Sequence, residues 1–182
     1  FFNFKASKKD IKCKFTKEGF AYFVILPISK TTPANFKPYI TYLTVFYHGK
    51  PTIAKRPPWD GGLIWTKDKS NSSWVSIACQ GLGASVWYPC KDIQSDEPDS
   101  AEMHITVPDT LVCVGNGRLR EVIKNGDGTA TYDWAVVNPI NNYCIIPYIG
   151  KYVHFGEVFK GEKGDLTMDY WILDSHLVKA QN

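Results

Sequence analysis

The 182-residue sequence lacks most of the patterns that mark a particular chemistry. It has no run of about 18 to 20 apolar residues, so we expect no membrane-spanning helix. It has no H-E-x-x-H motif, no histidine pair at helical metal-site spacing and no C-x-x-C pair, which argues against a zinc centre. The G-x-S-x-G elbow and the dinucleotide-binding glycine fingerprint are also missing. We therefore expect no catalytic residue and no metal ligand set in this chain.

The sequence also lacks a large excess of charge of either sign. It has 21 Lys and Arg residues against 18 Asp and Glu residues, and the basic residues are scattered rather than gathered in a stripe. Binding to nucleic acid usually requires a basic face, so we expect no nucleic-acid partner. Hydrophobic residues make up 44% of the chain, which suits an ordinary globular core.

Cysteine is present in an odd number and without clustering. The five cysteines are Cys13, Cys79, Cys90, Cys113 and Cys144. The simplest interpretation is that each is a small buried hydrophobe inside an apolar strand. A disulfide stays open, because sequence alone does not assign pairs.

The alternation of apolar and polar residues, with a period of two, is the main pattern of the sequence. In residues 101–107 one face carries Ala, Met, Ile and Val, and the other carries Glu, His and Thr, as in a half-buried strand. Strands are also expected at 11–15, 21–26, 39–47, 74–79, 111–114, 129–137, 143–149 and 166–173. Asn-Gly-Asp-Gly at 125–128 predicts a hairpin between 118–124 and 129–137.

These patterns predict an all-β fold of mostly antiparallel sheets, arranged as a saddle-like or sandwich domain without substantial helix. The exception is the end of the chain, where Asp174 or Ser175 could cap the start of a helix. The first residues show neither an initiator Met nor a signal pattern, so we expect a piece of a longer protein.

The segment 78–100, ACQGLGASVWYPCKDIQSDEPDS, combines glycines, aromatic residues and carboxylates. Its acidic residues are Asp92, Asp96, Glu97 and Asp99. They could bind a hard cation, but they lack the spacing of a calcium loop, and a solvated loop is the simpler interpretation.

This segment resembles a block in the zinc aminopeptidases related to aminopeptidase N and leukotriene hydrolase, the gluzincin metallopeptidases. In their N-terminal β domain, a Gln or Glu precedes an aromatic-or-aliphatic, Pro, Cys, x, Asp string, often followed by Glu-Pro. The matching residues are Gln80, then Trp-Tyr-Pro-Cys-Lys-Asp at 87–92, then Asp-Glu-Pro-Asp at 96–99. The Cys-Gln pair looks like the leukotriene hydrolase branch and its bacterial relatives.

Three further pieces follow the order of that family. Residues 105–119, ITVPDTLVCVGNGRL, resemble its strand, Val-Pro, strand, Asn-Gly sequence, and residues 134–152 resemble its Pro-x-x-x-Tyr strand. VFYHGKP at 45–51 with PWDGG at 58–62 is similar to bacterial members. The likeness covers about residues 40–173. It departs from the family at 93–95, so that either Asp92 or Asp96 could match the family aspartate, and before residue 40 the chain has fewer strands than the family.

The resemblance implies that residues 1–174 form the N-terminal β domain of a zinc aminopeptidase and that 175–182 lead toward a catalytic domain. That domain, the expected partner of this chain, would hold the zinc. The β domain would cover one side of the active site. Gln80 would bind the free α-amine of peptide substrates, and the small residues Gly81, Gly83 and Ala84 would allow a close approach.

Other interpretations remain open from the residues themselves. Gln80 could simply satisfy backbone groups at a strand end, while Trp87, Tyr88 and Pro89 are expected to pack rather than bind. The whole chain could instead be a β-sandwich module that binds carbohydrate or another ligand, because aromatic residues make up 14% of it. A structural domain of an envelope protein is a third possibility.

Overall fold

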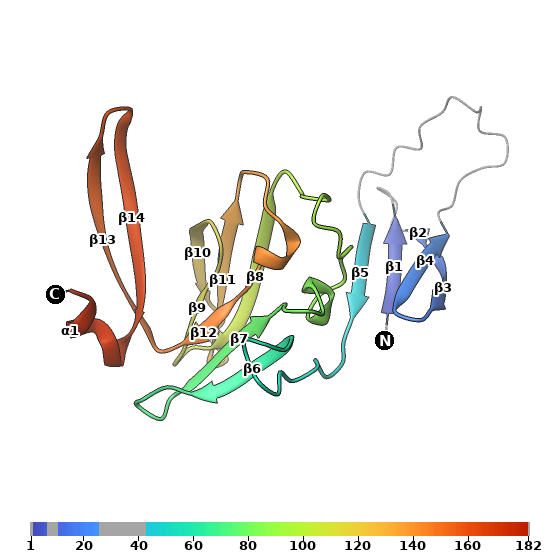
Figure 1. The fold of residues 1–182 in the computed structure, drawn as a ribbon, viewed down its shortest axis with the longest axis horizontal. Coiled ribbons are helices and arrows are strands. Elements are labelled where there is room, and N and C mark those ends of the chain that lie inside the picture. The colour runs from blue at the N-terminus through green and yellow to red at the C-terminus, as the bar shows by residue number, and fades with distance from the viewer. Residues whose placement is uncertain (1, 7–10, 26–42, 182) are drawn as a thin grey trace. The chain divides into compact units, whose positions relative to one another are not determined.

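The computed structural model describes residues 2–6, 11–25 and 43–181 of the chain. They form an all-β fold of antiparallel sheets with only short helical turns, as predicted (Figure 1). The chain divides into two compact units, residues 1–50 and 51–182. No helix among the described residues is long and apolar enough to cross a membrane.

The described residues of the first unit form two small antiparallel sheets. One has the order β2-β1-β5 and the other pairs β3 with β4. The strands are β1 (Phe2–Ala6), β2 (Ile11–Lys12), β3 (Lys14–Glu18), β4 (Ala21–Ile25) and β5 (Leu43–Tyr47). Cys13 is buried between β2 and β3 and packs against Tyr22, Val24 and Val45.

The second unit contains two larger sheets and a long hairpin. The four-stranded sheet has the order β6-β7-β12-β9, and the three-stranded sheet has the order β10-β11-β8. Their strands are β6 (Gly62–Lys67), β7 (Ser73–Ala78), β8 (Ala101–Pro108), β9 (Val112–Val114), β10 (Arg118–Lys124), β11 (Thr129–Val136) and β12 (Tyr148–Gly150). The hairpin pairs β13 (Tyr152–Gly161) with β14 (Gly164–Leu173) (Figure 1).

One hydrophobic core holds the two sheets of the second unit together. Its buried members come from both sheets and from the segment before β12: Met103, Val107, Cys113, Ala130, Tyr132, Trp134 and Ile145. β8 shows the predicted alternation, with its Glu, His and Thr side chains more exposed than Met103 and Val107. The β10–β11 pairing around residues 125–128 confirms the predicted hairpin.

Two local predictions were wrong. Residues 143–149 do not form one strand, because a 3-10 turn at Asn142–Cys144 precedes the short β12, and Pro147 carries no N–H for a ladder. Of the expected strand 39–47, residues 43–47 form β5, and residues 39–42 lie outside the described part. Only Cys113 lies inside a strand, whereas Cys79 and Cys90 are in loops.

The chain end forms the expected helix in short form, as a 3-10 turn at Asp174–His176 followed by α1 (Leu177–Ala180). Neither Asp174 nor Ser175 caps it. The residue before α1 is His176, and no side chain accepts a capping hydrogen bond there. The helix begins two residues later than a cap at Asp174 would place it, because the 3-10 turn takes up those residues.

Candidate functional site

A cavity of about 590 Å³ lies within the second unit. Residues from three separate segments line it, within 78–83, 92–94 and 142–146, and Pro58 adds a fourth contribution. The cavity therefore contains the predicted site residues Gln80, Gly81 and Gly83, together with Asp92.

Gln80 lies just beyond the end of β7, on an exposed turn. The N–H groups of Leu82 and Gly83 donate to the carbonyl of Cys79 at 3.3 and 2.8 Å, which closes the turn around Gln80. Gly81 has a φ of 71°, a left-handed conformation that favours glycine. Among the described residues the Gln80 side chain makes no hydrogen bond, so its amide does not satisfy backbone groups at the strand end. Its amide oxygen and nitrogen are free for a ligand.

The small residues after Gln80 serve different purposes. A Cβ on Gly81 would meet nothing within 4 Å, so its glycine is required by the turn rather than by crowding inside the chain. A Cβ on Gly83 would overlap the carboxylate of Asp92. Ala84 is fully buried at the start of a 3-10 turn (Ala84–Val86). Within the chain, the missing side chain of Gly83 thus leaves room for the Asp92 carboxylate to lie against the backbone.

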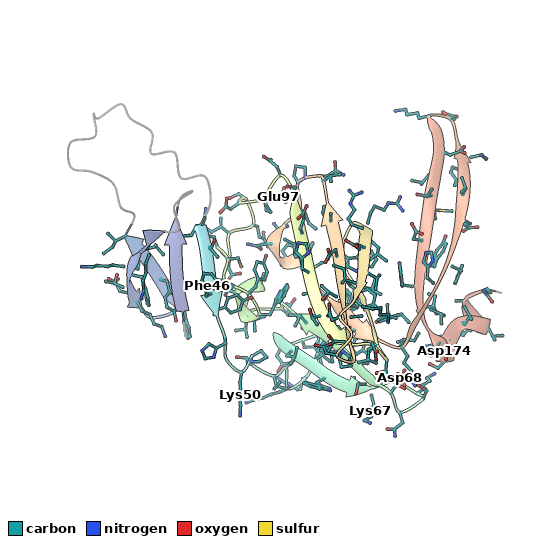
Figure 2. All side chains as sticks on the ribbon, turned by 180° about the vertical axis from the view of Figure 1, so that it is seen from behind. Phe46, Lys50, Lys67, Asp68, Glu97 and Asp174 are labelled. Atoms are coloured by element: carbon teal, nitrogen blue, oxygen red, sulfur yellow. The ribbon has the colours of Figure 1, made fainter. Side chains whose placement is uncertain are left out.

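Asp92 differs from the other carboxylates of its loop. Its Oδ1 atom accepts from the N–H of Ser85 at 3.1 Å and from the Cys90 thiol at 3.7 Å, and the residue lines the cavity. Asp96 instead forms an exposed ion pair with Lys91. Glu97 lies on the loop before β8, at the opposite end of this unit from Asp68 (Figure 2). The acidic loop is solvated as predicted, except that Asp92 faces the cavity.

Hydrogen bonds join the two far segments of the cavity wall. The Tyr88 hydroxyl donates to the carbonyl of Asn142 at 3.1 Å, and the Asn142 amide donates to the carbonyl of Lys91. Asn141 donates to the carbonyl of Gln94 at 2.7 Å. These contacts bridge about fifty residues of sequence and hold 88–94 against 141–144.

The aromatic residues of the segment pack, as predicted. Trp87 contacts the main hydrophobic core, and its ring lies 4.7 Å from that of Tyr88 in an edge arrangement. Buried aromatic side chains contribute about 1.5–3 kcal/mol each, so these two anchor the segment rather than bind a ligand.

The loop at residues 55–61, which the sequence motifs did not indicate as part of the site, also reaches the cavity through Pro58. In residues 55–61 the Asp60 carboxylate accepts from the N–H groups of Lys55 and Arg56, both at 2.6 Å. Gly61 lies against the Gln80 segment, because a Cβ there would be 2.7 Å from the Gln80 carbonyl oxygen. The signal available in the sequence was PWDGG at 58–62, where Asp before two glycines is typical of a tight turn.

The thiols near the cavity are held in their neutral form. Burial and then the charge of Asp92 raise the pKa of Cys79, and the same two causes raise the pKa of Cys90 to about 12. None of the five cysteines, all of which lie in the described part of the chain, forms a disulfide. A thiol with so high a pKa is a poor nucleophile at neutral pH, so the cavity offers hydrogen-bond acceptors and not a reactive sulfur.

The histidines do not gather into a metal centre. His104 pairs with Asp133 and His154 pairs with Asp169, each at 2.8 Å and on different strands. Within residues 2–6, 11–25 and 43–181, no group of three His, Cys, Asp or Glu side chains is placed to hold a metal ion.

A second concavity of similar volume lies beside the β13–β14 hairpin, between Trp74, Tyr148, Tyr152 and Trp171. Its wall is mainly aromatic and aliphatic, and it contains none of the predicted site residues. We take the Gln80 cavity as the candidate site, because Gln80 and Asp92 give it hydrogen-bond acceptors for a charged ligand.

The tryptophans do not form a row of exposed rings. Trp59 and Trp65 are exposed, at 81% and 69%, and they lie on different elements. The other tryptophans, Trp74, Trp87, Trp134 and Trp171, are buried or partly buried. The two exposed indoles therefore do not form one continuous aromatic face.

The sequence matches no family model and no curated protein. Solved structures share its fold. A two-domain M1 zinc metallopeptidase variant bound to L-arginine is 16% identical, with a TM-score of 0.66, and the match covers 92% of this chain and 37% of that one. A variant of the M1 zinc metallopeptidase of Deinococcus radiodurans, bound to a Tyr-Ser-Ala substrate, is 15% identical, with a TM-score of 0.65 and the same coverage.

A further structure of the Deinococcus radiodurans enzyme is 17% identical, with a TM-score of 0.61, and the match covers 92% of this chain and 36% of that one. The chain thus spans a little over a third of these relatives. At such low identity the match is one of fold. It agrees with the likeness predicted from the Gln80 and 87–99 motifs. The chain has the fold of M1 zinc metallopeptidases over the part that it matches.

Proposed function

We propose that this chain is the non-catalytic N-terminal β domain of a zinc-dependent aminopeptidase, where it covers one side of the active site and binds the free α-amine of the peptide through Gln80. One observation carries the proposal. On a chain with this fold, the unpaired amide of Gln80 lies on a closed turn at a cavity that also contains a carboxylate.

The chemistry of an ammonium group explains why these two residues belong together. An ammonium donates hydrogen bonds and carries a positive charge, so it needs acceptors and a nearby negative charge. The Gln80 amide oxygen supplies a neutral acceptor. The Asp92 carboxylate supplies charge on the same cavity wall, and pairs of this kind attract by about 4 kcal/mol at 4 Å near a protein surface.

Three of the similar structures were solved with ligands that fit this role. Their bound molecules are L-arginine, L-tryptophan and a Tyr-Ser-Ala substrate, and each of these carries a free α-amine. The zinc ion and the group that activates water would come from the catalytic domain, which would be the partner of this chain. When bound there, zinc would polarise the scissile carbonyl. The residues described here would contribute orientation of the amine.

We expect Gln80→Ala, made in the full-length protein that carries this chain, to weaken cleavage of aminoacyl amides. Losing one hydrogen bond to a charged group costs about 1.5–3 kcal/mol, which is roughly a ten- to hundredfold fall in kcat/KM. Gln80→Glu should be milder, because a carboxylate also accepts from an ammonium. The measurement is steady-state kinetics on chromogenic aminoacyl amides beside thermal melts.

Gln94→Ala is the matched control, because Gln94 lines the same cavity but has no assigned role toward the amine. An unchanged kcat/KM for Gln80→Ala, with an unchanged melting curve, would exclude the anchor. An equal loss on N-acetylated substrates would also count against it, since those have no ammonium to hold.

A further inference from the structure

The two faces of the β13–β14 hairpin differ in polarity. Successive residues of a strand point to opposite faces, so the register of the hairpin assigns each side chain to one of them. One face, which we call the outer face, is rich in large apolar side chains: Val153, Phe155, Phe159, Leu166, Met168 and Tyr170. The opposite face, which we call the inner face, carries polar side chains over most of its length: His154, Lys160, Asp165, Thr167 and Asp169.

The inner face is the one that contacts the rest of the second unit. Its Asp169 accepts from the Arg118 guanidinium of β10. Its Trp171 packs against Trp134 with ring centres 5.6 Å apart, and among the described residues Trp171 is the hairpin residue that packs against the main core. The apolar face of a sheet normally covers the core of its own domain. In this hairpin the apolar face instead points away from that core.

The outer face is apolar and exposed. Phe159 and Leu166 lie opposite each other in the register and are 57% and 53% exposed. The rings of Phe155 and Tyr170 stack on the same face, with centres 5.0 Å apart. Contiguous apolar surface of this kind marks an interaction site, and a hairpin of two strands is only marginally stable in water without something packed on it.

The charge on the outer face is also compatible with being covered. Among residues 152–173, all of which the structure describes, Glu157 is the charged side chain of this face. Its carboxylate accepts a hydrogen bond of 2.8 Å from the Tyr170 hydroxyl. A carboxylate that already has a donor beside it costs less to remove from water than one without a partner.

We propose that the outer face of the β13–β14 hairpin packs against an apolar surface of the catalytic domain in the full-length protein. This inference rests on the proposed function, because it takes the catalytic domain as the partner of this chain. It goes beyond that function by assigning the docking face.

The position of the last segment favours this partner over a second copy of the chain. Under the proposed function, residues 175–182 lead toward the catalytic domain, and they follow β14 directly. Three residues of that segment, His176, Lys179 and Ala180, line the same concavity as Ile172 of the outer face. The connection thus begins beside this face, so the domain to which it leads is present there at a high effective concentration.

The first test is hydroxyl-radical labelling of the full-length protein that carries this chain, read by mass spectrometry. Val158 is the matched comparison, because it is 51% exposed and adjoins Phe159 but lies on the inner face. The core of an interface is packed like a protein interior, so Phe159 and Leu166, corrected for intrinsic reactivity, should be labelled about fivefold less than Val158. Equal labelling of the three residues would overturn the proposal. The wild-type protein suffices for this test.

The second test compares Phe159→Ser with Val158→Ser in the full-length protein by hydrogen exchange. Both variants remove a strand-favouring apolar side chain from the same part of β13. If the outer face is covered, Phe159→Ser loses the burial of a phenyl ring and should speed exchange of the β13–β14 amides by roughly tenfold, against less than about twofold for Val158→Ser. Equal effects of the two variants would contradict a covered outer face.

Sedimentation and kinetics separate the remaining outcomes. If Phe159→Ser dissociates a dimer, a second copy covers the face and the proposal is wrong. If Phe159 is labelled like Val158 while Gln80→Ala weakens cleavage as expected, the amine anchor stands and the docking face fails. If the face is protected in an active monomer while Gln80→Ala has no effect, the docking face stands and the anchor fails. Protection in a monomer that cleaves no aminoacyl amide would reject both the proposed function and the catalytic domain as the partner.

Discussion

His104 lies between two carboxylates on the surface of the β8–β11 pair. Its Nδ1 atom lies 2.8 Å from Asp133 Oδ1 across the β8–β11 pair, and its Nε2 atom lies 3.7 Å from Glu102. The hydrogen bond with Asp133 raises the pKa of His104 above its ordinary value. Folding therefore favours the protonated imidazole at this position.

This shift predicts a pH dependence of stability. Because the folded-state pKa of His104 is raised, its contribution is fully present below the unfolded pKa of about 6.5 and is lost as the pH rises through the folded-state pKa. Asp133→Asn should lower the pKa of His104 toward its ordinary value. It should also reduce the melting temperature more at pH 6 than at pH 9. An NMR titration of His104 and melts at both pH values are the measurements.

Glu102→Gln is the control for that experiment, since its carboxylate is farther from the imidazole and contributes less than Asp133. If His104 titrates at the same pH in the wild type and in Asp133→Asn, the pair does not control its protonation.

At the scale of elements, Arg118 joins two parts of the second unit. From β10 its guanidinium donates to the Asp169 carboxylate and, at 3.0 Å, to the carbonyl of Thr167, both on β14. Trp171, also on β14, packs against Trp134 of the core with ring centres 5.6 Å apart. These contacts hold the β13–β14 hairpin to the β10–β11–β8 sheet.

We expect Arg118→Ala to loosen the β13–β14 hairpin without unfolding the core. Exposed ion pairs contribute about 0.5–1 kcal/mol, which corresponds to roughly two- to fivefold faster hydrogen exchange in the hairpin. Exchange followed by mass spectrometry on β13–β14 peptides checks this. Arg120→Ala is the control, because that exposed side chain of the same strand forms no hydrogen bond or ion pair with the described residues of β14. Equal effects of the two variants would contradict the role of Arg118.

At the scale of the whole molecule, the chain accounts for 36–37% of the length of its structural relatives. We expect the purified 182-residue chain alone to show no aminopeptidase turnover and no stoichiometric zinc. The sequence has no H-E-x-x-H motif, and the described residues offer no set of three metal ligands. Metal analysis after dialysis, together with a chromogenic aminoacyl assay, is the test. One zinc per chain with measurable turnover would contradict the expectation.

The sequence by itself determined the all-β class and most strand positions. Alternation along 101–107 and the turn at 125–128 are local, and a local pattern is sufficient when one face of a strand is buried. Residues 143–149 were wrongly predicted as one strand, because their apolar residues fit a continuous strand as well as they fit a turn followed by a short strand. In the fold, residues 142–144 form a 3-10 turn instead of a strand. Hydrogen bonds between Asn142 and the loop at 88–91 stabilise that turn, and they outweigh the β propensity of the run.

Only the tertiary structure decided what surrounds Gln80. The motif singled out Gln80, and the glycine at 81 was consistent with a turn, but the approach of Asp92 and the packing of Gly61 against the Gln80 carbonyl have no local signature. Residues 58–61, 78–83, 92–94 and 142–146 meet through long-range contacts, and no periodicity encodes which loops will meet. That depends on how the sheets pair and pack around their shared core.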